Sequence, residues 1–532
     1  MQQHPTPKWS YAAVAGLVVA LALVLRLPGY GGRALWLDEL WRVNLMLDDN
    51  IFERYWHSPD VYTAITAPLY LILNKVIAFF GLAPEILRLS SLVPGLASVV
   101  MAFLLARKVG AGLLLASTAA LLFAVNNDFV RYSNEYKPYM FEVFVHLCCT
   151  YVWLDLVLSE APPRTKWLTF FGVFAVAVFC SPTVVFLLPA AGVSILVHVW
   201  PRAQRHLGLA ITGFGGLGLL VLLLYVFVWS YGSDKELVSY WANGFYKLQE
   251  DSYLVFVAER LFAFWRGSFA TVGASKLLPL VTLIMFFTVS AYALTTKVES
   301  RPRFTQSVVA FYIVFLLTLL LLNYAELWPI GRLRPNQFVY AHFTMMFMFA
   351  LISCQKLRVR QNFGIIIIIL VLLGASRTNS LKLAEMGPPT EQSDKVWEAF
   401  MRLGQAGQIV DSQCAKAAVN VFFNPSMGHA ITYFVRHDQS INRAPSVLKQ
   451  SCVRLIGTSD AYADAAKTRQ QILDNGALNE PFWFIYSHLT DAEVAVLKSV
   501  AGRFGVLSSE TAFVGAGFFQ VTPPQLQHGQ AK

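Results

Sequence analysis

Long apolar stretches recur through residues 1–380, and most approach the roughly 20 residues that a helix needs to cross the hydrocarbon core of a bilayer. The stretches are 9–27, 86–106, 110–126, 138–158, 167–181, 183–200, 207–231, 275–296, 305–324, 337–354 and 363–376. The composition agrees, because 56% of the 532 residues are hydrophobic and 14% are charged, which is unusual for a water-soluble protein. The sequence predicts an α-helical polytopic membrane domain with about eleven transmembrane helices.

A cluster of basic residues follows every even-numbered stretch. The clusters are Arg107-Lys108, Arg164 with Lys166, Arg202 with Arg205, Lys297 with Arg301 and Arg303, and Lys356 with Arg358 and Arg360. Because Lys and Arg are retained on the cytoplasmic side, we expect a cytoplasmic N-terminus. Loops on the outer face are then expected at 28–85, 127–138, 232–274 and 325–336.

One apolar stretch, 63–82, is left out of the count because it carries Asn74 and Lys75 and is interrupted by Pro68. If it crossed the membrane, all five basic clusters would face outward. We therefore expect a helix lying in the outer interface, with a tilted span as the alternative. The last stretch, 363–376, is short, so a buried or interfacial helix is an alternative there too.

Residues 381–532 alternate polar and apolar segments and predict a C-terminal α/β domain. The expected strands are 408–410, 482–486 and 518–521, and the expected helices are 393–403, 461–473 and 491–500. Basic and acidic residues balance in this domain, so the net charge of +10 belongs to the membrane domain. Nucleic acid is therefore not an expected partner.

An odd number of spans places the C-terminal domain outside the cytoplasm, where its two cysteines would be oxidised. We predict a disulfide between Cys414 and Cys452. The other cysteines lie in or beside apolar runs and are expected to be small core residues: Cys148, Cys149, Cys180 and Cys354.

The first outer loop carries two adjacent carboxylates, Asp38 and Glu39, within segment 36–44. On a helix they point in different directions, so one can face a cavity while the other contacts a neighbouring helix. The alternative is structural, with Asp38 capping the helix N-terminus.

The second outer loop combines a carboxylate, two cations and three tyrosines within segment 131–139. These residues are Arg131, Tyr132, Glu135, Tyr136, Lys137 and Tyr139. Arg and Lys suit a phosphate, and tyrosines can stack on sugars, so the mixture suits an anionic, sugar-bearing substrate. The alternative is a structural ion pair between Arg131 and Glu135, four residues apart on a helix.

The fourth outer loop carries Arg332 and Arg334, which break the positive-inside pattern. An anionic partner explains this exception, either a substrate phosphate or the headgroups of phospholipids.

These segments together resemble the GT-C superfamily of glycosyltransferases that use polyprenyl-phosphate sugars, which includes protein O-mannosyltransferases and lipid A aminoarabinose transferases. The resemblance covers most of the chain: Asp38-Glu39 matches the acidic motif of the first outer loop, and 63–82 matches the interfacial helices. Glu135 matches a second acidic residue. Arg332 and Arg334 match the loop that grips lipid phosphate.

The second outer loop departs from these patterns, because it reads Tyr-Ser-x-Glu-x-Lys-x-Tyr in place of an Asp-centred motif. The chain looks closer to the bacterial envelope galacturonosyltransferases that decorate lipid A and the lipopolysaccharide core. The resemblance implies a bacterial inner-membrane enzyme whose active site faces the periplasm. Its expected partners are a polyprenyl-phosphate-linked sugar donor, a glycolipid or glycan acceptor, and the lipid bilayer.

The implied reaction transfers the sugar with inversion, with Asp38 as the base that takes the acceptor proton. The leaving phosphate would be stabilised by Arg131, Lys137, Arg332 and Arg334. Glu39 and Glu135 would orient the acceptor or bind a divalent cation, although no ligand spacing requires a cofactor. Two other functions stay open: a transporter or flippase of a lipid-linked anion, which should carry charges near the midplane, and a non-enzymatic envelope scaffold.

Overall fold

The computed structural model describes residues 8–30, 35–47, 67–159, 162–199, 206–229, 241–246, 252–271, 277–295, 302–331, 333–353, 357–375, 393–405, 419–440, 453–459, 461, 464–475 and 480–524. The chain divides into two compact units. The first contains 1–31, 52–81 and 85–387, and the second contains 32–51, 82–84 and 388–532. The first outer loop is therefore shared between the two units.

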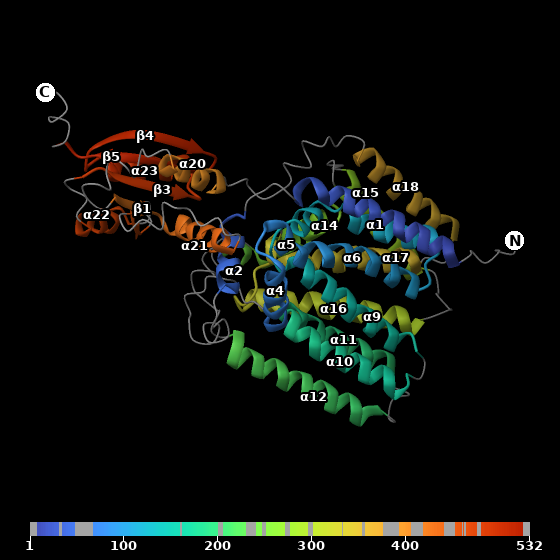
Figure 1. Cartoon of the computed structure of the whole chain (residues 1–532). Coiled ribbons are helices and arrows are strands. Elements are labelled where there is room, and N and C mark those ends of the chain that lie inside the picture. Colours follow the sequence, from blue (N-terminus) through green and yellow to red (C-terminus); the bar gives the residue numbers. More distant parts are fainter. Residues whose placement is uncertain are drawn as a thin grey trace. The chain divides into compact units, whose positions relative to one another are not determined.

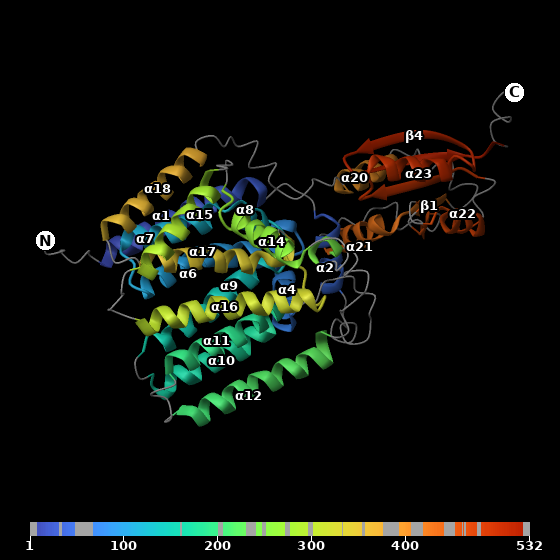
Figure 2. The ribbon, with the colours of Figure 1, turned by 180° about the vertical axis from the view of Figure 1, so that it is seen from behind.

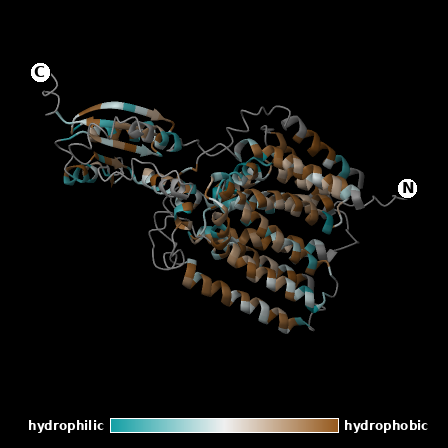
Figure 3. Cartoon of the chain, in the orientation of Figure 1, coloured by the Kyte–Doolittle hydropathy of each residue, from teal (hydrophilic) through white to brown (hydrophobic). Residues whose placement is uncertain are grey.

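The first unit is a bundle of apolar helices that lie side by side (Figures 1 and 2). The helices that match the predicted apolar stretches are α1 (Lys8–Tyr30), α6 (Leu89–Lys108), α7 (Leu113–Val125), α9 (Tyr139–Val157), α10 (Arg164–Cys180), α11 (Leu187–Val199), α12 (Leu207–Leu224), α15 (Leu277–Thr295), α16 (Pro302–Tyr324), α17 (Gln337–Ser353) and α18 (Leu357–Ala375). Each predicted stretch thus coincides with a helix over its described residues. Mostly hydrophobic colouring runs along these helices in Figure 3.

Within the described residues, five helical segments are long and apolar enough to cross a membrane: Ser10–Pro28, Pro84–Lys108, Tyr139–Val157, Leu207–Trp229 and Thr305–Tyr324. The chain is therefore a multi-pass membrane protein. The expected number of about eleven crossings stays a prediction.

Shorter elements complete the first unit. They are α4 (Pro68–Phe80), α5 (Pro84–Leu87), α8 (Asn127–Ser133), α14 (Tyr253–Ser268), the 3₁₀ turns η1 (Pro182–Phe186), η5 (Ala242–Gly244) and η6 (Arg334–Asn336), and a π-helical turn η3 (Tyr225–Trp229). α4 confirms a helix within 63–82, and its interfacial position stays a prediction. Its Asn74 is buried, and the Asn74 amide donates to the Tyr70 carbonyl at 2.7 Å.

A fully buried arginine, Arg26 on α1, ties three helices of the first unit together. Its guanidinium donates to the Ala22 carbonyl at 2.9 Å, to the Ala124 carbonyl at the end of α7 at 3.0 Å, and to the Ser133 hydroxyl at the end of α8 at 3.0 Å. The Ser133 hydroxyl fits because α6 presents Gly95, where a Cβ would lie only 2.2 Å from it. The turn between α7 and α8 is thereby fixed against α1.

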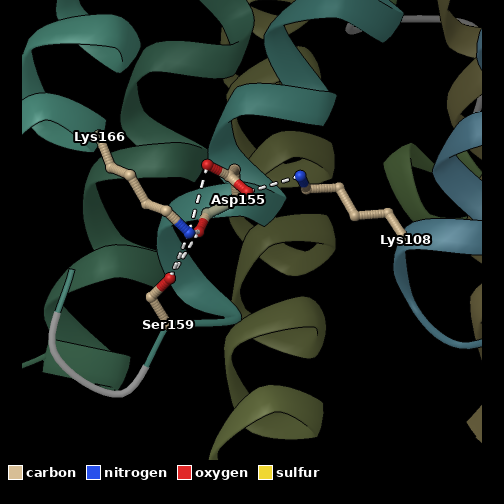
Figure 4. A network of polar contacts seen from close by, with 4 residues as sticks. All are labelled: Lys108, Asp155, Ser159 and Lys166. Carbon is tan, nitrogen blue, oxygen red and sulfur yellow. Dashed lines mark hydrogen bonds and ion pairs between the residues drawn. The ribbon is translucent and has the colours of Figure 1, made fainter. Parts of the chain in front are cut away.

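A polar network joins the ends of α6, α9 and α10 on the expected cytoplasmic side (Figure 4). Asp155 accepts from Lys108 at 2.6 Å and pairs with Lys166 at 3.4 Å. The Lys166 ammonium also donates to the Ser159 hydroxyl at 2.6 Å. The acidic residue near the end of the fourth predicted span therefore serves the packing of helix ends.

The second unit contains a five-stranded sheet with strand order β2-β1-β3-β5-β4. β2 (Val453–Gly457), β1 (Val419–Phe423) and β3 (Phe482–Ser487) are parallel, and β5 (Ala516–Thr522) and β4 (Val506–Phe513) continue the sheet in antiparallel order. The helices are α2 (Leu37–Met46), α20 (Ser393–Gln405), α21 (Pro425–Ser440), α22 (Ala465–Asp474) and α23 (Asp491–Ala501). The predicted α/β domain is confirmed.

The expected strands at 482–486 and 518–521 and the three expected helices are present, and 408–410 lies outside the described residues. Thr490 caps α23, since its hydroxyl accepts from the Glu493 amide at 3.4 Å while Glu493 accepts from the Thr490 amide at 2.7 Å. The sequence analysis missed β1, β2, β4 and α21.

We predict that Arg26→Met lowers the stability of the membrane domain by about 2–3 kcal/mol, because hydrogen bonds from a charged donor are lost and the Ala124 carbonyl stays buried. Thermal unfolding in detergent, followed by tryptophan fluorescence, measures the change. Leu27→Met, at the exposed neighbouring position, is the matched control. Equal melting temperatures for the two variants would contradict the role assigned to Arg26.

Candidate functional site

The adjacent carboxylates of the first outer loop lie at the N-terminus of α2, in the second unit. The N-cap of α2 is Trp36. The alternative that Asp38 caps this helix is therefore wrong. Glu39 is fully buried and accepts from the Trp36 amide at 3.2 Å. Asp38 is partly exposed. The two carboxylates thus separate, with Glu39 stabilising the helix start and Asp38 reaching the surface of its unit.

The second outer loop lies in the first unit, where Asn126 fixes the start of α8. The Asn126 side-chain oxygen accepts from the amides of Asp128 and Phe129, both at 3.0 Å. Its amide group donates to the carbonyls of Gly267 and Ser268, at 2.9 and 3.0 Å. One buried asparagine therefore caps α8 and joins it to the end of α14.

α8 brings together the charged and aromatic residues predicted from the sequence. Glu135 is fully buried, and its carboxylate lies 3.3 Å from Nε of Arg131, whose side chain is partly exposed. The Arg131 guanidinium also lies 5.5 Å from the centre of the Tyr132 ring, which packs edge-on against Tyr139 at 5.1 Å. The expected ion pair between Arg131 and Glu135 is present. The Arg131 side chain is 31% exposed, so an anion can approach its guanidinium group.

The backbone of the same segment is held rigidly. The Lys137 amide donates to the Glu135 carbonyl at 2.7 Å, and the Lys137 carbonyl accepts from the Ser91 hydroxyl of α6 at 2.8 Å. Tyr136 is completely buried, and Lys137 is 8% exposed. A lysine this deeply placed needs anionic or polar surroundings. Lys137 follows Glu135 by two residues, so it adds a second positive charge to the segment that carries Arg131.

The fourth outer loop folds against the third by hydrogen bonds. Asn336 donates to the carbonyls of Pro329 and Gly331 at 3.0 and 3.1 Å and accepts from the Trp328 indole at 2.8 Å. The Ile330 amide donates to the Gly244 carbonyl at 2.8 Å. The loop that carries Arg334 is thus a defined structure.

The positive charge of Arg334 acts on Tyr132 of α8. Burial raises the pKa of the Tyr132 hydroxyl above its ordinary value, and the negative charge of Glu135 raises it further. The positive charges of Arg131 and Arg334 act in the opposite direction on the same pKa. Of the two arginines predicted in this loop, the structure places Arg334 near the second outer loop, and Arg332 lies outside the described residues.

Two histidines inside the bundle were missed by the sequence analysis. His146 of α9 and His342 of α17 are fully buried. Nδ1 of His146 lies 3.1 Å from Nε2 of His342, and Nε2 of His146 lies 2.9 Å from the Thr183 hydroxyl. Their rings pack against Phe338 and Phe315 at 4.6 and 4.7 Å. The signal was one histidine in each of two apolar stretches. The pair is only partly satisfied, because Nδ1 of His342 is buried without a hydrogen-bond partner among the described residues.

An apolar groove of about 720 Å³ lies among α10, α11 and α12. Its lining includes Trp167, Leu188, Gly192, Phe214 and Gly218. α12 packs on α10 at the margin of the bundle (Figures 1 and 2). Because the lining is apolar and the groove is half open, it fits a hydrocarbon chain and not a polar ligand.

The remaining predicted residues divide in two groups. Cys414 and Cys452 lie outside the described residues, so their disulfide stays a prediction, whereas Cys148, Cys149 and Cys180 are free thiols. No three His, Cys, Asp or Glu side chains within the described ranges lie close enough together to hold a metal ion.

We predict that Asn126→Asp destabilises the membrane domain by about 1–3 kcal/mol, because the carboxylate can still cap α8 but cannot donate to the carbonyls of Gly267 and Ser268. Asn126→Ala, which also loses the cap, should cost about 1 kcal/mol more. Thermal unfolding of the two variants separates the contributions. An Asp variant as stable as the wild type would show that the link to α14 is unimportant.

Neither family models nor curated proteins match this chain. Among solved structures, ArnT from Cupriavidus metallidurans in the apo state is 13% identical, with a TM-score of 0.52 over 96% of this chain and 98% of ArnT. The oligosaccharyltransferase of Archaeoglobus fulgidus is 13% identical, with a TM-score of 0.49 over 89% of this chain and 72% of that one.

The ArnT alignment covers the membrane helices and the C-terminal domain alike. At this level of identity the likeness is one of fold. The chain shares the fold of ArnT, a polytopic helical membrane domain followed by a small C-terminal domain, which is the fold expected from the resemblance to the GT-C superfamily.

Proposed function

We propose that this chain is a membrane glycosyltransferase that moves a hexosyl or pentosyl group from a polyprenyl-phosphate donor to an envelope acceptor such as lipid A, lipopolysaccharide core or another glycan. The main support is the likeness in fold to ArnT over nearly the full length of both chains. The residues around α8 supply a second, independent argument, because Arg131 and Lys137 lie there with the buried carboxylate of Glu135.

In this proposal Asp38 takes the proton of the acceptor hydroxyl as that oxygen attacks the anomeric carbon. The bond between the anomeric carbon and the phosphate oxygen breaks, and the electron pair leaves with the phosphate. Direct displacement of this kind inverts the anomeric centre. Asp38 is the better base of the two adjacent carboxylates, because Glu39 is buried and engaged at the start of α2.

Negative charge develops on the departing polyprenyl phosphate. Arg131, Lys137 and Arg334 are the described cations that would stabilise it, and Arg332 is a further candidate. Glu135 holds Arg131 through its 3.3 Å contact and can orient the acceptor or bind a divalent cation. Of the three predicted tyrosines, Tyr139 is partly exposed and would contact the sugar, whereas Tyr132 and Tyr136 are buried. Phosphate is a good leaving group, so a general acid is not required.

The groove among α10, α11 and α12 supports a lipid-borne donor. A chain in this groove exchanges bilayer contacts for contacts with the protein, so binding depends on packing and not on removal of water. We assign the groove to the polyprenyl chain.

The reaction is proposed for the periplasmic face of a bacterial inner membrane, with the C-terminal domain on the same side. The positive-inside distribution supports this orientation, and an oxidised Cys414–Cys452 pair would agree with it.

We predict that Asp38→Asn lowers transfer by about 10²–10⁴-fold and Glu135→Gln by about 10²-fold, because the first removes the base and the second releases Arg131. The matched control is Asp155→Asn, which breaks the ion pairs with Lys108 and Lys166 at the other helix ends. Mass spectrometry of envelope glycolipids and polysaccharides from a complemented deletion strain measures the transferred sugar.

Loss of one sugar in the deletion strain, restored by wild type and Asp155→Asn but not by the other variants, is the expected result. Full restoration by both Asp38→Asn and Glu135→Gln would favour a transporter or flippase of a lipid-linked anion, or an envelope scaffold.

The groove is tested by Gly218→Leu, which places a side chain in it. Gly216→Leu is the matched control, since Gly216 is on the same helix, does not line the groove, and has open space around its Cβ position. We predict that undecaprenyl phosphate raises the melting temperature of the wild type and of Gly216→Leu but not of Gly218→Leu. An equal rise in all three would place the lipid elsewhere.

A further inference from the structure

We propose that the C-terminal α/β domain positions Asp38, by holding both ends of the first outer loop on one face of α21. The loop residues 32–51 and 82–84 belong to the same compact unit as 388–532. The helix that carries the candidate base is therefore built into the C-terminal domain and not into the membrane bundle. This inference rests on the proposed function for the role of Asp38, but the structural contact stands independently.

α2 needs an external partner to keep its position. It contains 10 residues, and isolated helices of this length are marginal in water. Most of its side chains are buried, including Leu40, Val43 and Met46. It packs on α21, and Figure 1 shows the two helices next to each other. The orientation of Asp38 therefore depends on the packing between α2 and α21.

Specific contacts set that packing. The Asn44 amide donates to the His429 carbonyl at 3.0 Å and lies 3.4 Å from Nδ1 of the same residue. The Trp41 and His429 rings meet edge-on at 5.7 Å. Trp41 lies three residues after Asp38, on the same side of α2. The α21 contact thus lies one turn from the candidate base.

The far end of the outer loop meets the same helix. The Tyr433 hydroxyl of α21 donates to the Leu82 carbonyl at 2.8 Å. His429 and Tyr433 are four residues apart, so they share one face of α21. This face therefore holds the loop at two points that are distant in sequence.

α21 is itself fixed to the sheet. Asn424, directly after β1, donates to the Ser487 carbonyl at 2.9 Å and accepts from the amides of Ser487 and Met427 at 3.1 and 3.3 Å. A Cβ at Gly428 would lie 2.9 Å from the Phe423 ring, so α21 approaches β1 closely only with glycine there. A continuous set of contacts therefore runs from the sheet through α21 to α2. His429 and Tyr433 are positioning residues, and they act on Asp38 through the loop.

The test compares the double variant Asn44→Ala/Tyr433→Phe with Thr432→Ala in the full-length protein. Thr432 is exposed on α21, and its hydroxyl donates to the Gly428 carbonyl of the same helix at 2.9 Å. Amide hydrogen exchange is measured in α2 and, as an internal reference, in α23. We expect faster exchange in α2 of the double variant, unchanged exchange in α23, and wild-type behaviour for Thr432→Ala.

Transfer kinetics provide the second measurement. We expect the kcat of the double variant to fall on the order of 10²-fold with an unchanged KM for the lipid donor, because a base displaced by about 1 Å loses alignment while donor binding is retained. Unchanged exchange in α2, or unchanged kcat despite faster exchange, would overturn the proposal. Absence of transfer in the wild type would defeat the proposed function alone, since the exchange experiment still tests the contact.

Discussion

The buried guanidinium group of Arg26 is the interaction on which the arrangement of the outer-loop residues depends. It joins α1 to the end of α7 and to Ser133, so the direction in which α8 leaves the bundle is set by its hydrogen bonds. Polar groups inside an apolar bundle are costly unless they are paired. A charged side chain that satisfies backbone carbonyls at a helix end therefore stabilises one geometry of the turn over the others. Asn126 extends the same principle from α8 to α14.

The apolar helices could be predicted because the bilayer imposes a length and a composition on each of them. Strands β3 and β5 were found from their composition, since both are rich in aromatic and β-branched residues. β1 was missed although Val419–Phe423 is as long and as apolar as the runs that were read as strands. α21 was missed although Asn424, which caps its start, and Pro425 after it are a recognisable helix start in the sequence. The bond between Asn424 and Ser487, which is 63 residues away, has no such local signal.

In the candidate site, too, local contacts could be predicted from the sequence and long-range contacts could not. The pairing of Arg131 with Glu135 was predicted from their spacing of four residues, and it forms although α8 ends at Ser133 and Glu135 lies just beyond it. The effect of Arg334 on Tyr132 was suggested only by sidedness, since no local pattern links two residues that are so distant in sequence. Asn44 and His429 are 385 residues apart and carry no mutual signal in one sequence. Such contacts are determined by how the separate elements pack.

The two adjacent carboxylates show why this long-range packing bears on chemistry. On α2 alone, Asp38 and Glu39 are equivalent candidates for a base, because both lie in its first turn. The fold separates them: Glu39 is buried and accepts from the Trp36 amide, whereas Asp38 stays partly exposed. A buried carboxylate cannot reach an acceptor hydroxyl. An exposed carboxylate on a helix that is not held in place has no defined orientation toward the acceptor. In our proposal the domain that follows the membrane helices supplies that orientation, so the candidate base Asp38, near residue 40, depends on α21, near residue 430.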